Sequence, residues 1–346
     1  MTEAQPDVID AQICYLLVMP CEDVKPVESP PAVQRLRDAP YFDVLDVEVR
    51  TTGSDSIVHD GTPITIHYQI YDGVAQIAEC YFSLPDVLSD TSLQTKARIQ
   101  TALRAHLTAV HPQRGDMVEE YVVLMISAIT GAPDEFIDRN GQTLARFIRA
   151  QREVFGPREI DDILISRVRY SEADLTVVDW EGAVIISPEG DFQSDIELLK
   201  IGNYQLLRYR LLDEAIDLNL TAVSQNLHDG ARRSLLPTRS KRVLRQVVEQ
   251  RLSLTLGFEK INQSLLLIGD WYTAKLYRAI YEEFYLDEWE AAIQAKLANL
   301  ESIIQVIQDN FEFSWARFLE LVQIAGWLLL LLGYFVLFFL DLRAYQ

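Results

Sequence analysis

The sequence predicts an α+β fold: a mixed, mostly antiparallel sheet in the N-terminal half, then long antiparallel helices, then a single C-terminal transmembrane helix. Three observations predict this arrangement. Short runs rich in β-branched and aromatic residues alternate with helical patterns up to about residue 190. After Pro188 the pattern changes to long helices. A stretch of twenty residues without a formal charge, 321–340, follows them.

The N-terminal region, residues 1–190, is expected to be a cytoplasmic α+β domain. Of the 346 residues, 49% are hydrophobic and 24% are charged, which is typical of a folded protein. Asp72-Gly73 separates two alternating runs, which is a strong hairpin signal, and Asp179–Gly182 is the expected turn of a second hairpin. The other expected elements are strands within 13–19, 41–50, 121–129 and 165–187, and helices over 92–107 and 134–151.

Residues 191–320 are expected to form a helical stalk that resembles a coiled coil. A first helix runs to about Asp229 despite Gly202, and the glycine at 230 begins a break. The last helix starts near Asp287 and has no stop signal before the uncharged stretch. Between the first and last helices, further helices are expected over 238–268 and 271–285.

The last helix carries a heptad pattern in which seam positions alternate by three and four residues. Seven of its eight seam positions between 297 and 321 are apolar, and Ser314 is the exception. This pattern predicts a seam that packs against the chain's own preceding helices, against another copy of the chain, or against both. The residues predicted to form the stalk seam are Leu297, Leu300, Ile304, Ile307, Phe311 and Phe318.

The uncharged stretch Leu321–Leu340 predicts membrane insertion. At ~1.5 Å per residue it would be about 30 Å long, the thickness of a bilayer hydrocarbon core. Only 341–346 follow it, which predicts a tail-anchored, single-pass membrane protein whose bulk is cytoplasmic. Gln323 is its one candidate for a polar intramembrane contact.

The charge distribution excludes some partners and indicates others. A net charge of −20 argues against a nucleic-acid partner, because phosphate contacts need a surplus of Lys and Arg. One segment, 231–251, runs against this background with seven basic residues and one acid. If the helix over 238–268 is antiparallel to the last one, this segment returns to the lipid bilayer and contacts anionic headgroups. Pairing with the acidic last helix is the competing explanation. The candidate headgroup contacts are Arg232, Arg233, Arg239, Lys241 and Arg242.

No motif in the sequence supports catalysis. Phosphate-binding loops, dinucleotide-binding glycines, zinc-protease motifs and nucleophile elbows are all absent from it. The five histidines lack metal-ligand spacing, and the three cysteines form no CxxC pair. We therefore expect no catalytic residues, no bound metal and no cofactor, and predict that the protein is not an enzyme.

Two stretches, 174–220 and 267–310, resemble the domain-of-unknown-function 155 group, which includes the "required for meiotic nuclear division" proteins and bacterial relatives. The matching features are Gly269-Asp270, the helix start at 286–289, and Arg317, Leu319 and Glu320. The resemblance covers roughly 120–340. It implies membrane association and oligomeric scaffolding, and it offers no active site to carry over.

The order of elements is also similar to that of CorA-type magnesium channels, in which an α/β domain precedes long stalk helices and a pore helix. This sequence lacks their Gly-Met-Asn signature and a second span. The sequence therefore predicts a tail-anchored scaffold that forms a homo-oligomer or docks a protein partner on the stalk or the α+β domain. An oligomeric cation channel or transporter is the alternative.

Overall fold

The computed structural model describes residues 8–21, 47–110, 117–230 and 271–344. The chain divides into two compact units. The first, here called the α/β unit, comprises Met1–Glu214 and Ser253–Ala291, and the second, the helical unit, comprises Ala215–Leu252 and Ala292–Gln346. The predicted boundary at 190 therefore differs from this division, because the first part of the long helix after it belongs with the sheet.

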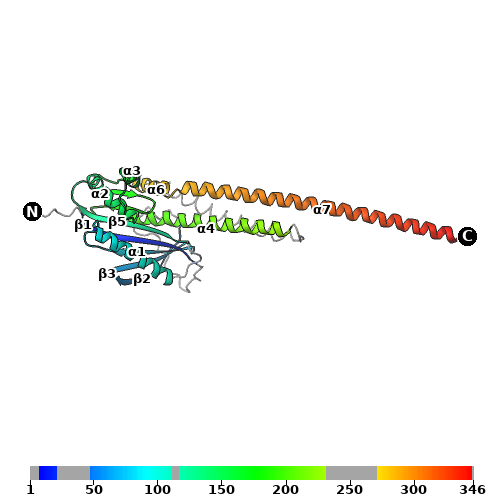
Figure 1. Cartoon of the computed structure of the whole chain (residues 1–346), viewed down its shortest axis with the longest axis horizontal. Coiled ribbons are helices and arrows are strands. Elements are labelled where there is room, and N and C mark those ends of the chain that lie inside the picture. Colours follow the sequence, from blue (N-terminus) through cyan, green and yellow to red (C-terminus); the bar gives the residue numbers. More distant parts are fainter. Residues whose placement is uncertain (1–7, 22–46, 111–116, 231–270, 345–346) are drawn as a thin grey trace, which may run out of the picture. The chain divides into compact units, whose positions relative to one another are not determined.

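The α/β unit is built on one mixed sheet of eight strands in the order β2-β3-β4-β1-β5-β8-β7-β6 (Figure 1). All paired strands are antiparallel except β5 and β8, which are parallel. The strands are β1 (Val8–Pro20), β2 (Val49–His59), β3 (Thr62–Tyr71), β4 (Ala75–Phe82), β5 (Glu119–Ile129), β6 (Arg167–Val168), β7 (Leu175–Val178) and β8 (Gly182–Ile186).

Helices form where the sequence shows helical spacing of its apolar residues. The helices with described bounds are α1 (Asp90–Val110), α2 (Pro133–Ile148), α3 (Pro157–Ile163), α4 (Gln193–Gly230), α6 (Trp271–Glu283) and α7 (Leu286–Ala344). The helix predicted over 238–268 lies outside the described residues, as does the part of 41–50 before 47. The predicted antiparallel pairing of the long helices, which depends on 238–268, is therefore not described.

The predicted hairpin at Asp72-Gly73 is confirmed. Three residues, 72–74, connect β3 to β4; Asp72 and Gly73 have positive φ, 51° and 65°, and the N–H of Val74 donates to the carbonyl of Tyr71 at 2.9 Å, which closes the turn. Glycine adopts such angles without a steric penalty, and aspartate is among the few other residues that tolerate them. The turn fixes the register in which Tyr71 pairs with Ala75, and that register decides which side chains of β3 and β4 share a face.

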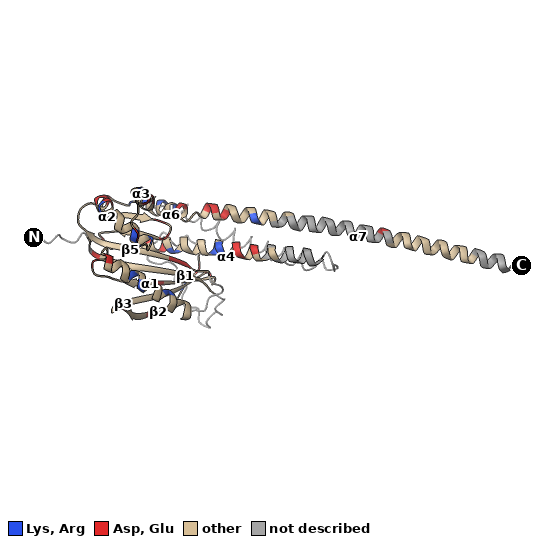
Figure 2. Ribbon diagram, viewed as in Figure 1, with Lys and Arg blue, Asp and Glu red and all other residues tan. Residues whose placement is uncertain are grey.

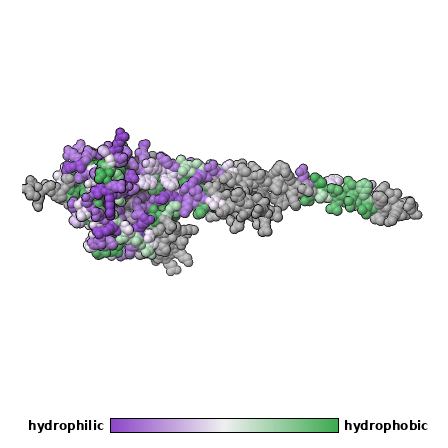
Figure 3. Space-filling view, in the orientation of Figure 1, coloured by the Kyte–Doolittle hydropathy of each residue, from purple (hydrophilic) through white to green (hydrophobic). Residues whose placement is uncertain are grey.

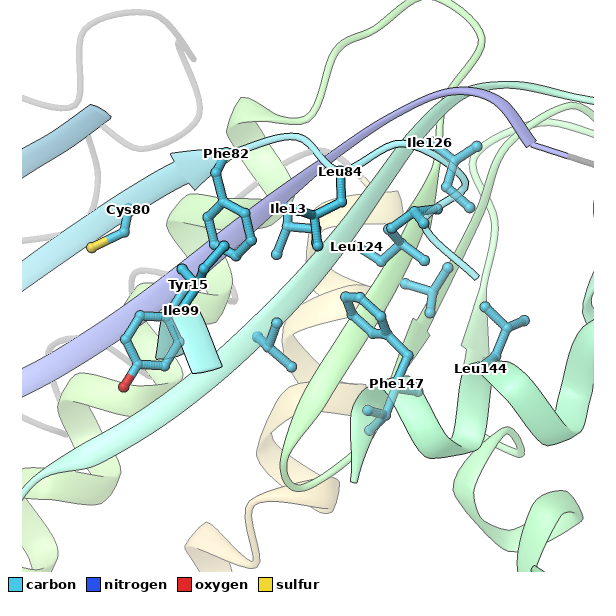
Figure 4. Packing of buried hydrophobic residues seen from close by; sticks show 14 of the residues in the cluster. Ile13, Tyr15, Cys80, Phe82, Leu84, Ile99, Leu124, Ile126, Leu144 and Phe147 are labelled. Atoms are coloured by element: carbon cyan, nitrogen blue, oxygen red, sulfur yellow. The ribbon is translucent and has the colours of Figure 1, made fainter. Parts of the chain in front are cut away.

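One face of the sheet is covered by α1 and α2 (Figure 4). Alternate residues of the central strands, such as Ile13 and Tyr15 of β1 and Leu124 of β5, meet Ile99 of α1 and Phe147 of α2 in one buried cluster. Strand side chains alternate between faces, and the alternate residues, such as Leu16 of β1 and Val123 of β5, are buried on the other face.

The opposite face belongs to α4 and α6. Gly202 sits inside α4, where glycine normally weakens a helix. A Cβ at this position would lie 2.5 Å from Cγ2 of Ile280 and 3.1 Å from Cε2 of Phe284, both in or directly after α6. The glycine therefore allows α4 and α6 to approach closely, which explains why the helix continues through it.

The junction between α6 and α7 is a defined bend. Tyr285 has φ +50°, an unusual value for a residue with a side chain. Its neighbours Phe284 and Leu286 are both fully buried, and the ring of Trp180 contacts Phe284 and Tyr285 at centroid distances of 6.1 and 5.8 Å. Burial on both sides of Tyr285 thus holds the strained backbone in place.

In the helical unit, α4 and α7 are joined by a short contact. The Nζ of Lys296 lies 2.9 Å from both carboxylate oxygens of Asp217. Ile216, Ile293 and Leu297 are buried next to this ion pair in the sequence. Leu297, the first residue of the predicted seam, is therefore already covered within a single chain.

The predicted transmembrane helix Leu321–Leu340 is not supported. Within the described part of the chain, no helix is both long enough and apolar enough to cross a membrane. The predictions of a tail anchor, of a single-pass membrane location and of a cytoplasmic bulk defined by that anchor are corrected accordingly.

Candidate functional site

The most unusual polar feature of the α/β unit is a set of three buried charged residues and one half-buried glutamine between the sheet and α4. It consists of Gln69 on β3, Glu79 on β4, and Glu197 and Lys200 on α4, and we call it the Lys200 network. Lys200 is 0% exposed, and Glu79 and Glu197 are each 4% exposed. Charged side chains are seldom buried to this degree unless they are paired.

Local geometry explains why these four residues meet. Tyr68 and Cys80, the sequence neighbours of Gln69 and Glu79, belong to the cluster under α1 and α2. Because side chains alternate along a strand, Gln69 and Glu79 lie on the opposite face, which α4 covers. Gln69 pairs with Ile77, so Glu79 lies diagonally across from it on the next strand. Glu197 and Lys200 are three residues apart, which places them on the same face of α4.

The ammonium group of Lys200 has a full set of acceptors. Its Nζ donates to Oε1 of Gln69 at 2.9 Å, to Oε1 of Glu79 at 2.6 Å and to Oε1 of Glu197. A lysine ammonium has three donors, so all three are used. Burial opposes the charged form, but the carboxylates of Glu197 and Glu79 outweigh it and raise the pKa of Lys200.

Both carboxylates have further donors. The hydroxyl of Tyr81 donates to Oε2 of Glu79 at 2.9 Å, and that of Tyr71 donates to Oε2 of Glu197 at 3.2 Å. Burial, followed by the charge of Glu197, raises the pKa of Tyr71 well above its ordinary value. With both glutamates ionised, the network holds one more negative charge than positive, and its carboxylates are available as proton acceptors next to a buried amine.

Other polar contacts attach α4 to the sheet along its first five turns. Asp195 accepts from Thr176 at 2.6 Å and from Tyr272 at 2.8 Å. Further along, the Tyr204 hydroxyl donates to Asp72 in the β3–β4 turn at 2.6 Å. Arg210 then pairs with Glu119 of β5 at 2.6 Å. These contacts fix the rotation and the register of α4 on the sheet.

Burial shifts the titration of two of these acids. It raises the pKa of Asp195 to about 6, against the opposing hydrogen bonds from Thr176 and Tyr272. It raises the pKa of Glu119 to about 7, although Arg210 favours the charged form. Both groups therefore change charge closer to neutral pH than an exposed carboxyl does.

On the other face of the sheet, Lys96 of α1 is a second buried lysine. Its Nζ donates to the backbone carbonyl of Phe147 and lies 4.1 Å from the centroid of that residue's ring. Burial lowers the pKa of Lys96 to about 7, and the charge of Glu181 only partly opposes this. Lys200 and Lys96 thus show opposite shifts, because only Lys200 has carboxylates at hydrogen-bonding distance.

None of the residues predicted from the sequence as sites belongs to the Lys200 network. Leu297 is buried in the helical unit, and Gln323 is exposed on α7. The other seam positions, Leu300, Ile304, Ile307, Phe311 and Phe318, fall within the bounds of α7, but their side chains lie outside the described residues. The headgroup candidates Arg232, Arg233, Arg239, Lys241 and Arg242 also lie outside the described residues.

Sequence reasoning missed the Lys200 network, although a signal existed. Glu79 interrupts the apolar run of β4, and Lys200 interrupts the run ELLKIG of α4. A lone charge inside a segment expected to be buried indicates a paired group. The sequence could not identify the partners of Lys200, because Gln69 is 131 residues away from it. Among the described residues, no group of three or more His, Cys, Asp or Glu is placed to hold a metal ion.

Comparison with known proteins finds one uncharacterised family. The family model described as the N-terminal domain of the uncharacterized protein MJ0711 matches residues 62–193. The uncharacterized protein MJ0711 of Methanocaldococcus jannaschii is 26% identical over 203 residues, which cover 59% of this chain and 62% of the relative. No solved structure matches the chain.

The matched range gives the similarity a structural meaning. It begins at β3 and ends at the first residue of α4, so it includes Gln69 and Glu79 and stops before Glu197 and Lys200. Within this chain the matched range spans β3 to β8 and α1 to α3, and the printed description of the similar protein assigns no activity.

Proposed function

We propose that the protein is a non-enzymatic assembly module that self-associates through the C-terminal half of α7 and so brings copies of the α/β unit together. The observation that carries this proposal is the exposure of large apolar side chains between Val322 and Leu337. Their exposed fractions range from 52% to 73%, and they form the green stretch of Figure 3.

An exposed apolar surface of this kind is favourable only when another surface covers it. Soluble proteins rarely leave contiguous apolar patches uncovered, and such patches usually mark interaction sites. The stretch carries no charged residue that would oppose close packing (Figure 2). We call it the apolar segment of α7 and define it as residues 322–337.

A second copy of the chain is the occupant that the sequence pattern favours. The spacing of three and four that runs through Leu297 and Leu321 continues through Leu328, Leu332 and Phe335. In a dimer, full burial of these three residues in both copies would contribute about 9–18 kcal/mol. That is comparable with the ~4–15 kcal/mol that association costs.

The apolar segment is apolar on every side, which bears on the number of copies. Trp327, Leu330, Tyr334 and Leu337 lie outside the three-four pattern and are also exposed. A two-stranded assembly would leave them uncovered, whereas a bundle of three or more helices covers more of the helix surface. We therefore expect an oligomer larger than a dimer.

The second function suggested by the sequence, a cation channel or transporter, is not favoured by any observation on the described residues. It requires a helix that crosses a membrane, and the described part of α7 does not provide one. Partner docking on the α/β unit remains compatible with self-association, but no contact singles out a docking surface there.

The experiment is a measurement of molar mass by light scattering on the full-length protein over a range of concentrations, with any detergent mass subtracted. A variant with Leu328, Leu332 and Phe335 replaced by Ser tests the pattern. Its matched control has Leu330, Tyr334 and Leu337 replaced by Ser, which removes similar apolar area from the same helix. We expect a discrete oligomer that the first variant weakens more strongly than the second, because the seam positions lie closest to the neighbouring helices.

Three outcomes would contradict the proposal. The first is a monomer at every concentration. The second is an equal effect of the two triple variants, which would indicate general hydrophobic contact rather than a seam. The third is a monomer that floats with lipid vesicles, because a lipid surface would then be the cover of the apolar segment.

A further inference from the structure

Gln69 and Lys200 form the one lysine–carboxamide contact of the Lys200 network. The Nζ of Lys200 lies 2.9 Å from Oε1 of Gln69, and the carbon Cδ of the amide is one bond beyond that oxygen. Two carboxylates, those of Glu79 and Glu197, are hydrogen-bonded to the same Nζ. Buried lysine, carboxamide and proton acceptor are the three groups that an amide exchange between side chains needs.

We propose that Lys200 and Gln69 react within the folded chain to form an isopeptide bond that joins α4 covalently to β3. Nζ of Lys200 attacks Cδ of Gln69, the Nζ–Cδ bond forms, and the Cδ–Nε2 bond breaks. The former side-chain amide nitrogen of Gln69 leaves as ammonia. No oxidant, reductant or second molecule enters the reaction.

The protons balance through the neighbouring carboxylates. Glu79 first takes one proton from the Lys200 ammonium, which gives the neutral amine that attacks. The attacking nitrogen loses a second proton to a carboxylate, and the leaving nitrogen takes up both. The products are a neutral amide, an ammonium ion and two glutamates in their starting state.

The charges of the network act in opposite directions on this reaction. Glu197 and Glu79 raise the pKa of Lys200, so the attacking amine is the minor form at neutral pH. The same carboxylates can accept the proton of Lys200; Oε1 of Glu79 lies 2.6 Å from Nζ. In a buried site, a neutral amine next to a neutral acid is tolerated better than separated charges are. Fixed proximity raises the rate of such intramolecular reactions by effective molarities of about 10⁵–10⁸ M.

Burial affects the outcome as well as the rate. Lys200 is 0% exposed and Gln69 is half-buried, so access of bulk water, the reactant that would hydrolyse the product, is restricted from the side of Lys200. The bond would close a loop between residues 131 positions apart, which restricts the unfolded chain as a disulfide does. The α/β unit would then resist unfolding without any cysteine pairing.

The test is the intact mass of the full-length protein after complete denaturation. We expect a mass lower than the sequence mass by one ammonia, and a protease digest in which the peptide containing Gln69 is joined to the one containing Lys200. A wild-type mass equal to the sequence mass, in protein that was folded and aged at neutral pH, overturns the proposal. That measurement needs no variant and so does not depend on any substitution being tolerated.

Two controls identify the source of a lost ammonia. Gln205 is 1% exposed and hydrogen-bonded to Tyr277 rather than to a lysine, so its peptide should stay unmodified. Glu79→Gln removes one of the two carboxylates hydrogen-bonded to Nζ of Lys200, and we expect at least a tenfold slower appearance of the joined peptides. Loss of ammonia without joined peptides, or an unchanged rate in E79Q, would contradict the assigned chemistry. The result is independent of self-association through α7.

Discussion

The α/β unit and the apolar segment of α7 differ in whether their side chains have partners within the chain. In the α/β unit, charged groups such as Lys200 and Glu79 are buried, and each has partners from the same chain. In the apolar segment, Leu329 and Trp327 are exposed, with exposed fractions of 73% and 67%. The α/β unit therefore pairs its buried charges within one copy, whereas the apolar segment carries exposed apolar side chains, which we propose a second copy covers.

The sharpest test of this contrast is the removal of the buried positive charge. Lys200→Met leaves Glu79 and Glu197 buried without their cation, and we expect a loss of about 3–5 kcal/mol in the free energy of unfolding. Lys296→Met removes the lysine of the exposed pair with Asp217, and should change it by less than about 1 kcal/mol. Denaturant unfolding of both variants measures the difference. Similar losses would mean that the Lys200 network is not the special feature of the α/β unit.

A smaller effect is expected where α4 and α6 touch. Gly202→Ala places a Cβ 2.5 Å from Ile280, so one of the helices must shift, at a cost of about 1–3 kcal/mol. Gly53→Ala on β2 meets no atom within 4 Å and should stay within about 0.5 kcal/mol of the wild type. Thermal unfolding of the two variants compares them. A stabilising G202A would show that α6 can move away from α4 without loss.

The pH dependence of stability reports on Lys96. Its pKa is lowered to about 7 from 10.5, so between these values the unfolded chain holds a proton that the folded chain has lost. The free energy of unfolding therefore rises with pH across this window, by at most ~1.4 kcal/mol per pH unit from this group. Lys96→Met should remove that rise, as seen by subtracting the two pH profiles. Parallel profiles would mean that Lys96 keeps its proton when folded, held by the ring of Phe147.

The weakest expected effect concerns salt and self-association. Residues 281–320 contain nine acids and two basic residues, so neighbouring copies repel one another before the apolar segment is reached. Raising NaCl from 0.1 to 1 M shortens the screening length from ~10 to ~3 Å, and should tighten assembly by roughly threefold or more. Sedimentation at both salt concentrations measures it. Weaker assembly at high salt would point to charge pairing between copies instead of apolar contact.

Much of the fold could be predicted from local pattern. The turn at Asp72-Gly73, the strand over 13–19 and the helix from about Asp287 all follow from period, propensity and turn chemistry, which depend on neighbours in the sequence. The apolar segment was also evident, but the membrane span inferred from it is not supported by the described residues. The apolar side chains indicate an interaction surface, but the sequence does not show which molecule binds it.

The sequence by itself determined most of the elements, the absence of recognisable catalytic motifs and the apolar character of residues 322–337. Only the tertiary structure decided the strand order, in which β1 lies between β4 and β5, and the meeting of Gln69 with Lys200. It also decided that the start of α4 and all of α6 belong with the sheet. The physical reason is distance along the chain: periodicity constrains residues within a few positions, whereas burial and charge pairing select partners more than a hundred residues apart.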